Sequence, residues 1–466
     1  MSAIHAIPAM VKAFALFPAL YLFNTTTPMD DLLAARFQMA LSLGFHIIFA
    51  CIGMVMPFFM AVAHYKWLRT KDAVYKNLTK AWSKGVAIFF ATGAVSGTVL
   101  SFELGLLWPK FMEHAGPIFG MPFSLEGTAF FIEAIALGFF LYGWDRFNDW
   151  FHWFTGVVVG LSGLASGILV VAANGWMNSP SGFDYIDGKF LNIDPIEAMF
   201  NDAWLTQALH MTLAAFAATG FAVAGVHSMM LYQQKNILFH KKAFIIAGYF
   251  GSIAALLQPI SGDLSAKDVA QRQPGKLAAM EALYFTQRSA PLLIGGIPDT
   301  ENKKVNHAIE LPGMLSFLAH GDFESEVKGL DTIPADEHPP VPIVHYAFQI
   351  MVGCGVMLMT FAIIFLLAQL RKKWYDQKWF LLLFTVSIPL GFVAIEAGWT
   401  VTEVGRQPWI IYGIMRTSDA VTPMAGIVWS FYLFTAVYIS LSVVVIFLLN
   451  RQIKMVPKIY DTPHKL

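Results

Sequence analysis

The sequence predicts an all-α integral membrane protein, with about nine transmembrane helices in a bundle and one long loop on the outer side. Hydrophobic residues make up 56% of the 466-residue chain and charged residues only 13%, about half the charged share of soluble domains. Mean hydropathy is +0.57. Apolar runs of about 20 residues, the length that a helix needs to cross a bilayer, recur along the chain. Tryptophans lie at the ends of several runs, as expected at membrane interfaces.

The runs divide the chain into five parts. Residues 29–260 hold six expected spans, 261–342 form an outer loop, 343–450 hold three spans, and 451–466 form a cytoplasmic tail. The nine expected spans are 34–63, 82–107, 124–143, 152–177, 206–231, 243–260, 343–370, 379–399 and 422–449.

Residues 1–28 form an unassigned N-terminal extension. They contain a short apolar stretch, Phe14 to Phe23, which Pro18 interrupts. This stretch is too short for a confident span, and no clear cleavage site follows it. An interfacial segment, a poor signal sequence and a true start at Met29 all remain open.

The charge of the short loops predicts the orientation. Lys and Arg gather after the first, fifth, seventh and ninth spans, whereas the connections after the second and fourth spans each hold a single lysine. By the positive-inside rule the core begins outside and the C-terminus is cytoplasmic. The connection 144–151, with one arginine against two aspartates, is the exception. The total charge is balanced, with 31 basic and 31 acidic residues, which gives no indication of a nucleic-acid partner.

Polar side chains that are rare in membrane spans gather at one depth. The orientation places His46, His210, Met351 and Glu403 in or near the outer half, on four different spans. Each has an ordinary explanation taken singly: a histidine satisfied by hydrogen bonds, a methionine that fills the core, or an acid at a solvated helix end. Together they indicate a metal centre, because histidine and methionine are axial ligands of haem iron. Without a Cys-x-x-Cys-His motif such a haem would be non-covalent.

Further carboxylates lie at the same level. Glu103 ends the second span, and Glu126 and Glu133 share one face of the third at a spacing of seven. Such a pair suits a proton relay, but an ion transporter could use it equally well. The two cysteines, Cys51 and Cys354, lie inside apolar spans and predict no disulfide or cysteine metal site.

The motifs around these residues resemble those of subunit I of the cytochrome bd-type quinol oxidases, of the class with a short loop. The resemblance covers about residues 29 to 450, with the motifs in the family order. The motifs are Gly-Phe-His46, Leu-Glu126-Gly, Phe-Ile-Glu133, Gly143-Trp-Asp-Arg146, Ala173-Asn-Gly-Trp-Met177, Lys276-Leu-Ala-Ala-Met-Glu281, Phe348-Gln-Ile-Met351, Glu396-Ala-Gly-Trp399 and Gly405-Arg-Gln-Pro-Trp409.

The resemblance implies a terminal oxidase that oxidises membrane quinol at the outer face and reduces dioxygen to water. Protons taken from the cytoplasm would charge the membrane without a pump. The implied cofactors are a low-spin haem b, a high-spin haem b and a haem d. Subunit II is the implied partner, with small single-helix subunits possible. The expected location is a bacterial or archaeal plasma membrane.

The resemblance also assigns residues. His210 and Met351 match the ligands of the low-spin haem, and His46 and Glu403 match those of the two high-spin haems, in an order left open. Lys276 and Glu281 match quinol-binding residues of the loop, which is expected to be an ordered lid. Glu126 and Glu133 match proton-transfer acids. The residues expected beside the haems are Arg406, Trp399, Glu103 and Gln349.

Gln349 departs from the family pattern, because many members have arginine there. A contact to the low-spin haem would then be lost, so the sequence does not indicate the redox potential of that haem. Two other functions compete: a polytopic ion transporter that uses Glu126 and Glu133, and a haem-b quinone reductase module with no oxygen site. A reduced-minus-oxidised spectrum separates all three.

Overall fold

The computed structural model describes residues 29–234 and 237–460. Within these residues nine helices are long and apolar enough to cross a membrane, which confirms the predicted fold class. The extension 1–28 and the end of the tail, 461–466, lie outside the described residues.

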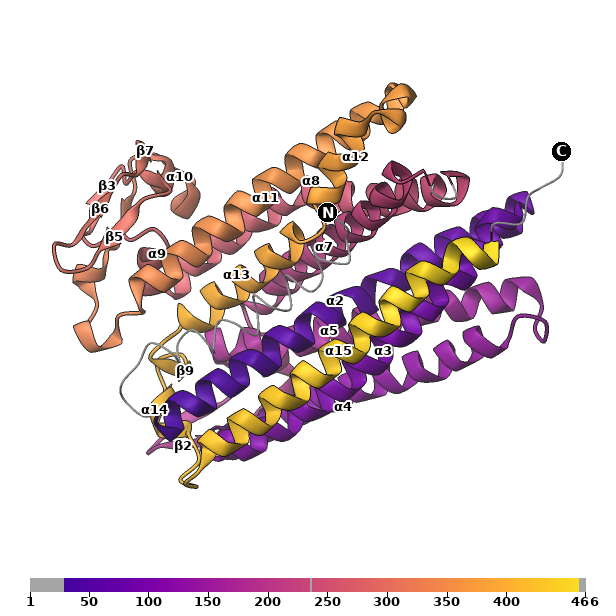
Figure 1. The fold of residues 1–466 in the computed structure, drawn as a ribbon. Coiled ribbons are helices and arrows are strands. Elements are labelled where there is room, and N and C mark those ends of the chain that lie inside the picture. The colour runs from indigo at the N-terminus through magenta and orange to yellow at the C-terminus, as the bar shows by residue number, and fades with distance from the viewer. Residues whose placement is uncertain (1–28, 235–236, 461–466) are drawn as a thin grey trace.

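Five long helices form one side of the bundle (Figure 1). Asp30 and Asp72 start the first two by accepting a hydrogen bond from a backbone N–H in the first turn, and Asn148 does the same for the fourth. The C-terminal helix packs along the first two. These helices are α2 (Asp31–Thr70), α3 (Ala73–Leu107), α4 (Pro109–Tyr142), α5 (Asp149–Asn178) and α15 (Ile427–Tyr460).

The remaining spans form the other side. They are α7 (Trp204–Tyr232), α8 (Ile237–Arg272), α11 (Val341–Leu370), α12 (Lys378–Val386) and α13 (Leu390–Val404). Small residues allow α7 and α8 to approach closely: a Cβ on Gly220 would lie 2.4 Å from the Gly251 Cα. Helix α8 continues to Arg272, beyond the end of its apolar run at residue 260.

The eighth span consists of two helices. Pro389 follows the end of α12, and its ring and missing N–H prevent a continuous helix. The hydroxyl of Ser387 donates to the Phe384 carbonyl at 2.7 Å, which satisfies one of the carbonyls freed at the break. Helix α13 then packs tightly on α7, since a Cβ on Gly391 would lie 2.3 Å from the Ala218 Cα.

The long loop is an ordered unit of short helices and nested antiparallel strand pairs. Two glycines with positive φ, Gly295 and Gly296, make the turn between its second and third strands. The pairs are β3 (Gln287–Arg288) with β8 (Glu326–Val327), β4 (Leu292–Ile294) with β7 (Ile309–Leu311), and β5 (Ile297–Asp299) with β6 (Lys304–Asn306). The helical elements are α9 (Pro274–Met280), α10 (Met314–His320) and the 3₁₀ turns Leu330–Thr332 and Ala335–Glu337.

Short elements at the same end of the bundle complete this face (Figure 1). Arg416 and Asp336 connect two of its segments by an ion pair of 2.6 Å. These elements are β1 (Asp184–Ile186), β2 (Lys189–Leu191), α6 (Pro195–Met199), β9 (Trp409–Ile411), β10 (Met415–Arg416) and α14 (Thr417–Ala420). A 3₁₀ turn, Lys372–Asp376, lies between α11 and α12.

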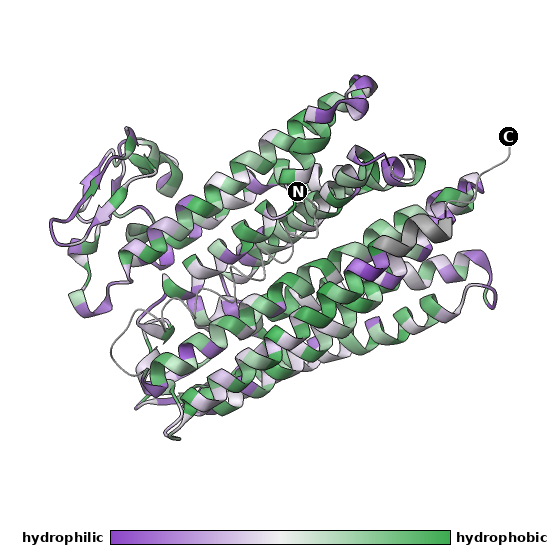
Figure 2. Cartoon of the chain, viewed as in Figure 1, coloured by the Kyte–Doolittle hydropathy of each residue, from purple (hydrophilic) through white to green (hydrophobic). Residues whose placement is uncertain are grey.

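Hydrophobic residues cover the lengths of the helices, and hydrophilic ones concentrate at their ends and in the loop (Figure 2). Large apolar side chains are strongly exposed on the helix surfaces, for example Phe131, Trp429 and Phe447. In water such a surface would be unstable, but it is the surface expected to contact lipid or another subunit.

Candidate functional site

His46 lies on α2, and its imidazole contacts α3. Nδ1 is 2.9 Å from Ser96 Oγ, and that hydroxyl donates its own proton to the Thr92 carbonyl at 2.8 Å. Ser96 therefore accepts the Nδ1 proton, which leaves Nε2 with a free lone pair, as metal binding requires. A Cβ on Gly97 would lie 3.0 Å from Cε1, so glycine at this position makes room for the ring.

His210 on α7 has the same arrangement with α8. Nδ1 is 3.0 Å from Ser261 Oγ, which donates to the Gln258 carbonyl at 2.9 Å. With its proton on Nδ1 toward Ser261, the ring would keep the lone pair on Nε2; the Gln258 side-chain nitrogen lies 3.1 Å from Nε2 and 3.2 Å from Nδ1. A metal at Nε2 would replace that amide contact, so Gln258 would have to rotate away.

Met351 on α11 points at α13. A Cβ on Gly398 would lie 3.0 Å from Sδ, so a larger residue there would displace the thioether. Helix α7, which carries His210, and helix α11, which carries Met351, both pack on α8 and on α13.

Glu403 at the end of α13 has both carboxylate oxygens hydrogen-bonded. Arg406 donates to Oε2 at 2.6 Å, and Asn174 on α5 donates to Oε1 at 2.5 Å. The Glu403 side chain is 31% exposed, whereas that of Arg406 is 1% exposed. Each oxygen keeps a second lone pair, so these bonds are compatible with metal binding and would orient the carboxylate.

A chain of hydrogen bonds extends from Glu403 to the loop. Lys276 Nζ donates to Asn178 Oδ1 at 2.6 Å, and Asn178 Nδ2 donates to Asn174 Oδ1 at 2.9 Å. Asn174 then donates to Glu403. All the donors point toward the carboxylate, so a change in the charge of Lys276 is transmitted to Glu403 through two amide dipoles.

Lys276 and Glu281 are buried at opposite ends of one helical segment, with 5% and 1% exposure. Burial lowers the pKa of Lys276 to about 7; Arg406 adds to this effect, and Glu403 opposes it. Burial raises the pKa of Glu281 to about 8, and the nearby backbone amide of Leu293 opposes the shift. Neither Glu281 oxygen has a partner at normal hydrogen-bond geometry among the described residues. A buried acid and base near neutrality suit proton exchange with a ligand.

Gln349 on α11 contacts the loop. Its Oε1 accepts from the Gly295 backbone N–H and its Nε2 donates to the Leu293 carbonyl, both at 2.9 Å. Both ends of its amide are therefore used by β4 and the turn that follows.

Glu126 and Glu133 both face α5, as their spacing predicts. Ser166 donates to Glu126 at 3.0 Å. The carboxylate of Glu133 lies against Gly163, where a Cβ would be 3.3 Å from its oxygens. Glu133 is 7% exposed. The two acids therefore lie one after the other along the contact between α4 and α5.

Three more predicted residues have buried polar atoms with no hydrogen-bond partner among the described residues. These atoms are Nε and Nη1 of Arg406, Nε1 of Trp399 and Oε2 of Glu103. The other oxygen of Glu103 accepts from Gln38 at 2.9 Å. Unpaired buried donors are costly, and those of Arg406 fit an acidic group such as the carboxylates at the edge of a porphyrin.

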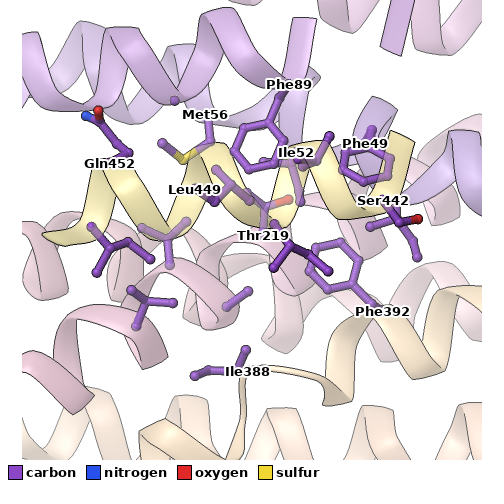
Figure 3. A pocket seen from close by; sticks show the side chains of 18 of the residues that line it. Phe49, Ile52, Met56, Phe89, Thr219, Ile388, Phe392, Ser442, Leu449 and Gln452 are labelled. Carbon is purple, nitrogen blue, oxygen red and sulfur yellow. The ribbon is translucent and has the colours of Figure 1, made fainter. Parts of the chain in front are cut away.

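An apolar cavity of about 280 Å³ lies apart from this site, between α2, α3, α7, α15 and the α12–α13 break (Figure 3). Phe49, Met56, Phe392 and Leu449 are among its lining residues. None of the predicted site residues lines it. Its mostly apolar walls suit hydrocarbon, although His227, His240 and Tyr438 also line it.

Comparison with known proteins identifies the family. The family model for cytochrome bd terminal oxidase subunit I matches residues 34–457. This chain belongs to that family. The resemblance inferred from the motifs is confirmed, and the transporter and the quinone reductase module are excluded as its function.

Similar cytochrome bd proteins span nearly the whole chain. Two are from Bacillus subtilis: a provisionally assigned menaquinol oxidase subunit I, 38% identical over 90% of this chain and 96% of its own length, and a ubiquinol oxidase subunit 1, 32% identical over 91% and 94%. The solved bd oxidase from Geobacillus thermodenitrificans is 38% identical and matches with a TM-score of 0.87 over 91% of this chain and 98% of that one.

The protein is therefore a multi-pass membrane subunit of a cytochrome bd terminal respiratory oxidase, which oxidises quinol, contains haem and includes other subunits. The residues present fit haem. Ser96 and Ser261 can accept the Nδ1 protons of the two histidines, which leaves each Nε2 for a metal. Glycines make room for His46 and Met351, and Nε and Nη1 of Arg406 are buried donors with no partner among the described residues.

The motifs did not assign several residues that the structure brings to the site. Asn174 lies within the motif Ala173-Asn-Gly-Trp-Met177, and Asn178 is one helical turn further along. Their position on one helix face was the indication in the sequence that they act together. Ser96, Ser261 and Gln258 gave no signal, because single polar residues are common in membrane helices. Their contacts appear only when the helices are packed.

Proposed function

We propose that His210 and Met351 bind a low-spin haem b, and that His46 and Glu403 bind the two high-spin haems, one b and one d. The serine hydroxyls at Nδ1 of both histidines, which can accept that proton and leave Nε2 free, and the glycine beside Met351 support this assignment. Haem supplies one-electron transfer and the reduction of dioxygen. The protein orients the ligands and stabilises charge through Arg406. Trp399 and Glu103 would lie beside the haems and use their unpaired polar atoms there.

Lys276 and Glu281 bind quinol in this proposal. The carboxylate of Glu281 accepts a proton from the quinol hydroxyl, because burial makes it a stronger base than an ordinary carboxylate. Lys276 donates a hydrogen bond to a quinol oxygen. The names of the two Bacillus relatives mention different quinols, so both menaquinol and ubiquinol are candidate substrates.

The observation that carries the proposal is the hydrogen-bond chain from Lys276 through Asn178 and Asn174 to Glu403. It joins the residue that would contact quinol to a residue that would bind the iron of one of the two high-spin haems. An ordinary solvated helix end has no need of a buried lysine and two amides in series, one of them buried.

Proton supply and orientation complete the proposal. Lys71, Lys76 and Lys80 lie around Trp67 and Trp144 at the end of the bundle opposite the loop, as expected of a cytoplasmic face. Protons enter there and pass Glu133 and Glu126. Quinol releases its protons at the outer face, so turnover charges the membrane without pumping.

The apolar outer faces of α3, α4 and α15 suit contact with subunit II and any small single-helix subunits. Over their most apolar stretches, these three helices are among the least buried spans of the described chain. The location proposed is the plasma membrane of a bacterial cell, with the core N-terminus outside and the C-terminus in the cytoplasm.

The testing experiment uses the purified multi-subunit oxidase. Met351→Leu keeps the side-chain volume but removes the thioether, so the low-spin haem becomes high-spin or falls in potential. Lys276→Met and Glu281→Gln slow haem reduction by quinol and leave all haem spectra intact. An unchanged low-spin spectrum in Met351→Leu refutes the ligand assignment, and loss of haem in both loop variants refutes the quinol assignment.

A further inference from the structure

Helix α11 begins with two polar residues on the face toward the loop. His345 and Gln349 are one turn apart, so their side chains lie on one face of the helix. His345 is fully buried, and its Nδ1 is 2.8 Å from the Met280 carbonyl. Its Nε2 is 3.2 Å from the Gly295 carbonyl. Both residues therefore hold loop segments against the start of α11. The loop lies beside this end of the helix in Figure 1.

The amide of Gln349 acts on the backbone as a neighbouring strand would. It donates to the carbonyl of Leu293 and accepts from the N–H of Gly295, two residues further on. A paired strand offers one donor and one acceptor in this way. Strand β4 has β7 on one side only, so Gln349 completes its other edge. An amide side chain supplies both groups, whereas arginine and lysine donate only and an ionised glutamate accepts only.

This contact lies beside Glu281. The backbone amide of Leu293 is near enough to act on the Glu281 carboxyl, and the same residue's carbonyl is held by Gln349. On the other side His345 holds Met280, the residue before Glu281. The peptides that surround the Glu281 carboxyl are thus fixed from α11 on both sides. Gln349 is also two residues from Met351, on the same helix.

We propose that Gln349 is a positioning residue for quinol oxidation: its side-chain amide completes the edge of β4 and holds the Leu293 backbone in place beside Glu281. The inference rests on the proposed quinol-binding role of Glu281. It differs from a role beside the low-spin haem, because both polar groups of Gln349 are already engaged by the loop.

The test compares Gln349→Met and Gln349→Glu in the purified oxidase. Methionine keeps the length and removes both hydrogen bonds; glutamate keeps the acceptor for Gly295 and loses the donor to Leu293. Gln369→Met is the matched control, because Gln369 also lies on α11 but at its other end, where it donates to the Phe365 carbonyl of the same helix. Three quantities are measured: amide hydrogen exchange of the segment 292–296, KM and kcat with a short-chain quinol, and the haem absorption spectra.

We expect Gln349→Met to speed exchange in that segment and to raise KM by about tenfold, which corresponds to about 1.4 kcal/mol. The increase in KM exceeds the change in kcat. The haem spectra and the Gln369→Met control stay unchanged. Gln349→Glu gives a smaller increase in exchange at Gly295 than Gln349→Met, since it keeps that bond.

Two results overturn the inference: unchanged exchange and KM in Gln349→Met, or an altered low-spin haem spectrum with unchanged exchange. Glu281→Gln, measured alongside, distinguishes a failure of the positioning role of Gln349 from a failure of the proposed quinol site. If Glu281→Gln impairs quinol kinetics and Gln349→Met does not, the positioning role fails alone. If Glu281→Gln leaves quinol kinetics intact, the proposed quinol site itself fails.

Discussion

The ammonium of Lys276 on α9 donates a hydrogen bond of 2.6 Å to the side-chain carbonyl of Asn178 at the end of α5. Both residues are buried, at 5% and 3% exposure. The bond joins the loop to the helix that carries Asn174, and through it to Glu403.

Asn178→Leu is the first prediction. It leaves the buried Lys276 without this partner, at a cost of about 1–3 kcal/mol. We expect KM for quinol to rise by about tenfold or more and the band of the Glu403 haem to shift slightly, because Asn174 also loses its donor. Asn302→Leu, in an exposed turn of the loop, is the control and leaves both unchanged. A normal KM in Asn178→Leu would rule out a role for this chain of bonds.

The second prediction concerns pH. The Glu281 carboxyl has a pKa raised to about 8, so it is protonated below that pH and loses its capacity to accept a proton. Haem reduction by quinol should therefore rise with pH through about 8 in stopped-flow measurements. Glu281→Gln should abolish this limb and leave a slower rate that does not titrate there.

The raised pKa of Glu281 affects stability in the opposite direction: the rate rises with pH, whereas the stability falls. An ordinary carboxyl in the unfolded chain ionises at a much lower pH, so the folded state holds the extra proton between the two pKa values. The Glu281 contribution to stability is complete below the unfolded pKa and is lost as pH rises through about 8. A thermal-unfolding series of Glu281→Gln should show a weaker fall in Tm over this window than the unaltered protein.

The third prediction concerns the serines that orient the histidines. Ser261→Ala removes the acceptor of the His210 Nδ1 proton, so the ring can adopt the other tautomer. We expect a lower or heterogeneous midpoint potential for the low-spin haem, with the high-spin haems unchanged. Ser96→Ala should alter only the His46 haem, and threonine at either position should restore the spectrum. Identical redox titrations for both alanine variants and the unaltered oxidase would disprove the orienting role.

Much of the fold followed from hydropathy, because nine apolar runs permit few other arrangements. Helix ends did not follow: α8 continues to Arg272, since backbone hydrogen bonding continues where the apolar run stops. The break at Pro389 lies inside the span expected at 379–399, where the run of apolar residues concealed it. Strand pairs in the loop had no signal, as each strand has only two or three residues.

The candidate site was visible in the sequence only through its ionisable residues and its motifs. Glu403, Lys276 and Glu281 stand out because charge is rare in such a chain. Asn178 and Gln349 owe their roles to segments 98 and 56 residues away, and no local pattern reports such contacts. Gln349 was expected beside a haem, and its observed partners belong to the loop.

The last prediction tests whether Glu403 is a metal ligand or only the partner of Arg406. If the pair is structural, Glu403→Gln leaves a buried arginine without its counter-charge, which costs about 3–5 kcal/mol, and every haem is lost together as the subunit unfolds. If Glu403 binds iron, the amide is a poor replacement, and one high-spin haem alone is lost or altered. We expect the second outcome: the His210–Met351 haem keeps its spectrum and is still reduced by quinol, while oxygen consumption collapses. Asp336→Asn is the matched control, because it removes an exposed arginine partner at the same distance of 2.6 Å and should change nothing measurable. Purified Glu403→Gln oxidase with all haems and full activity would eliminate Glu403 as a ligand.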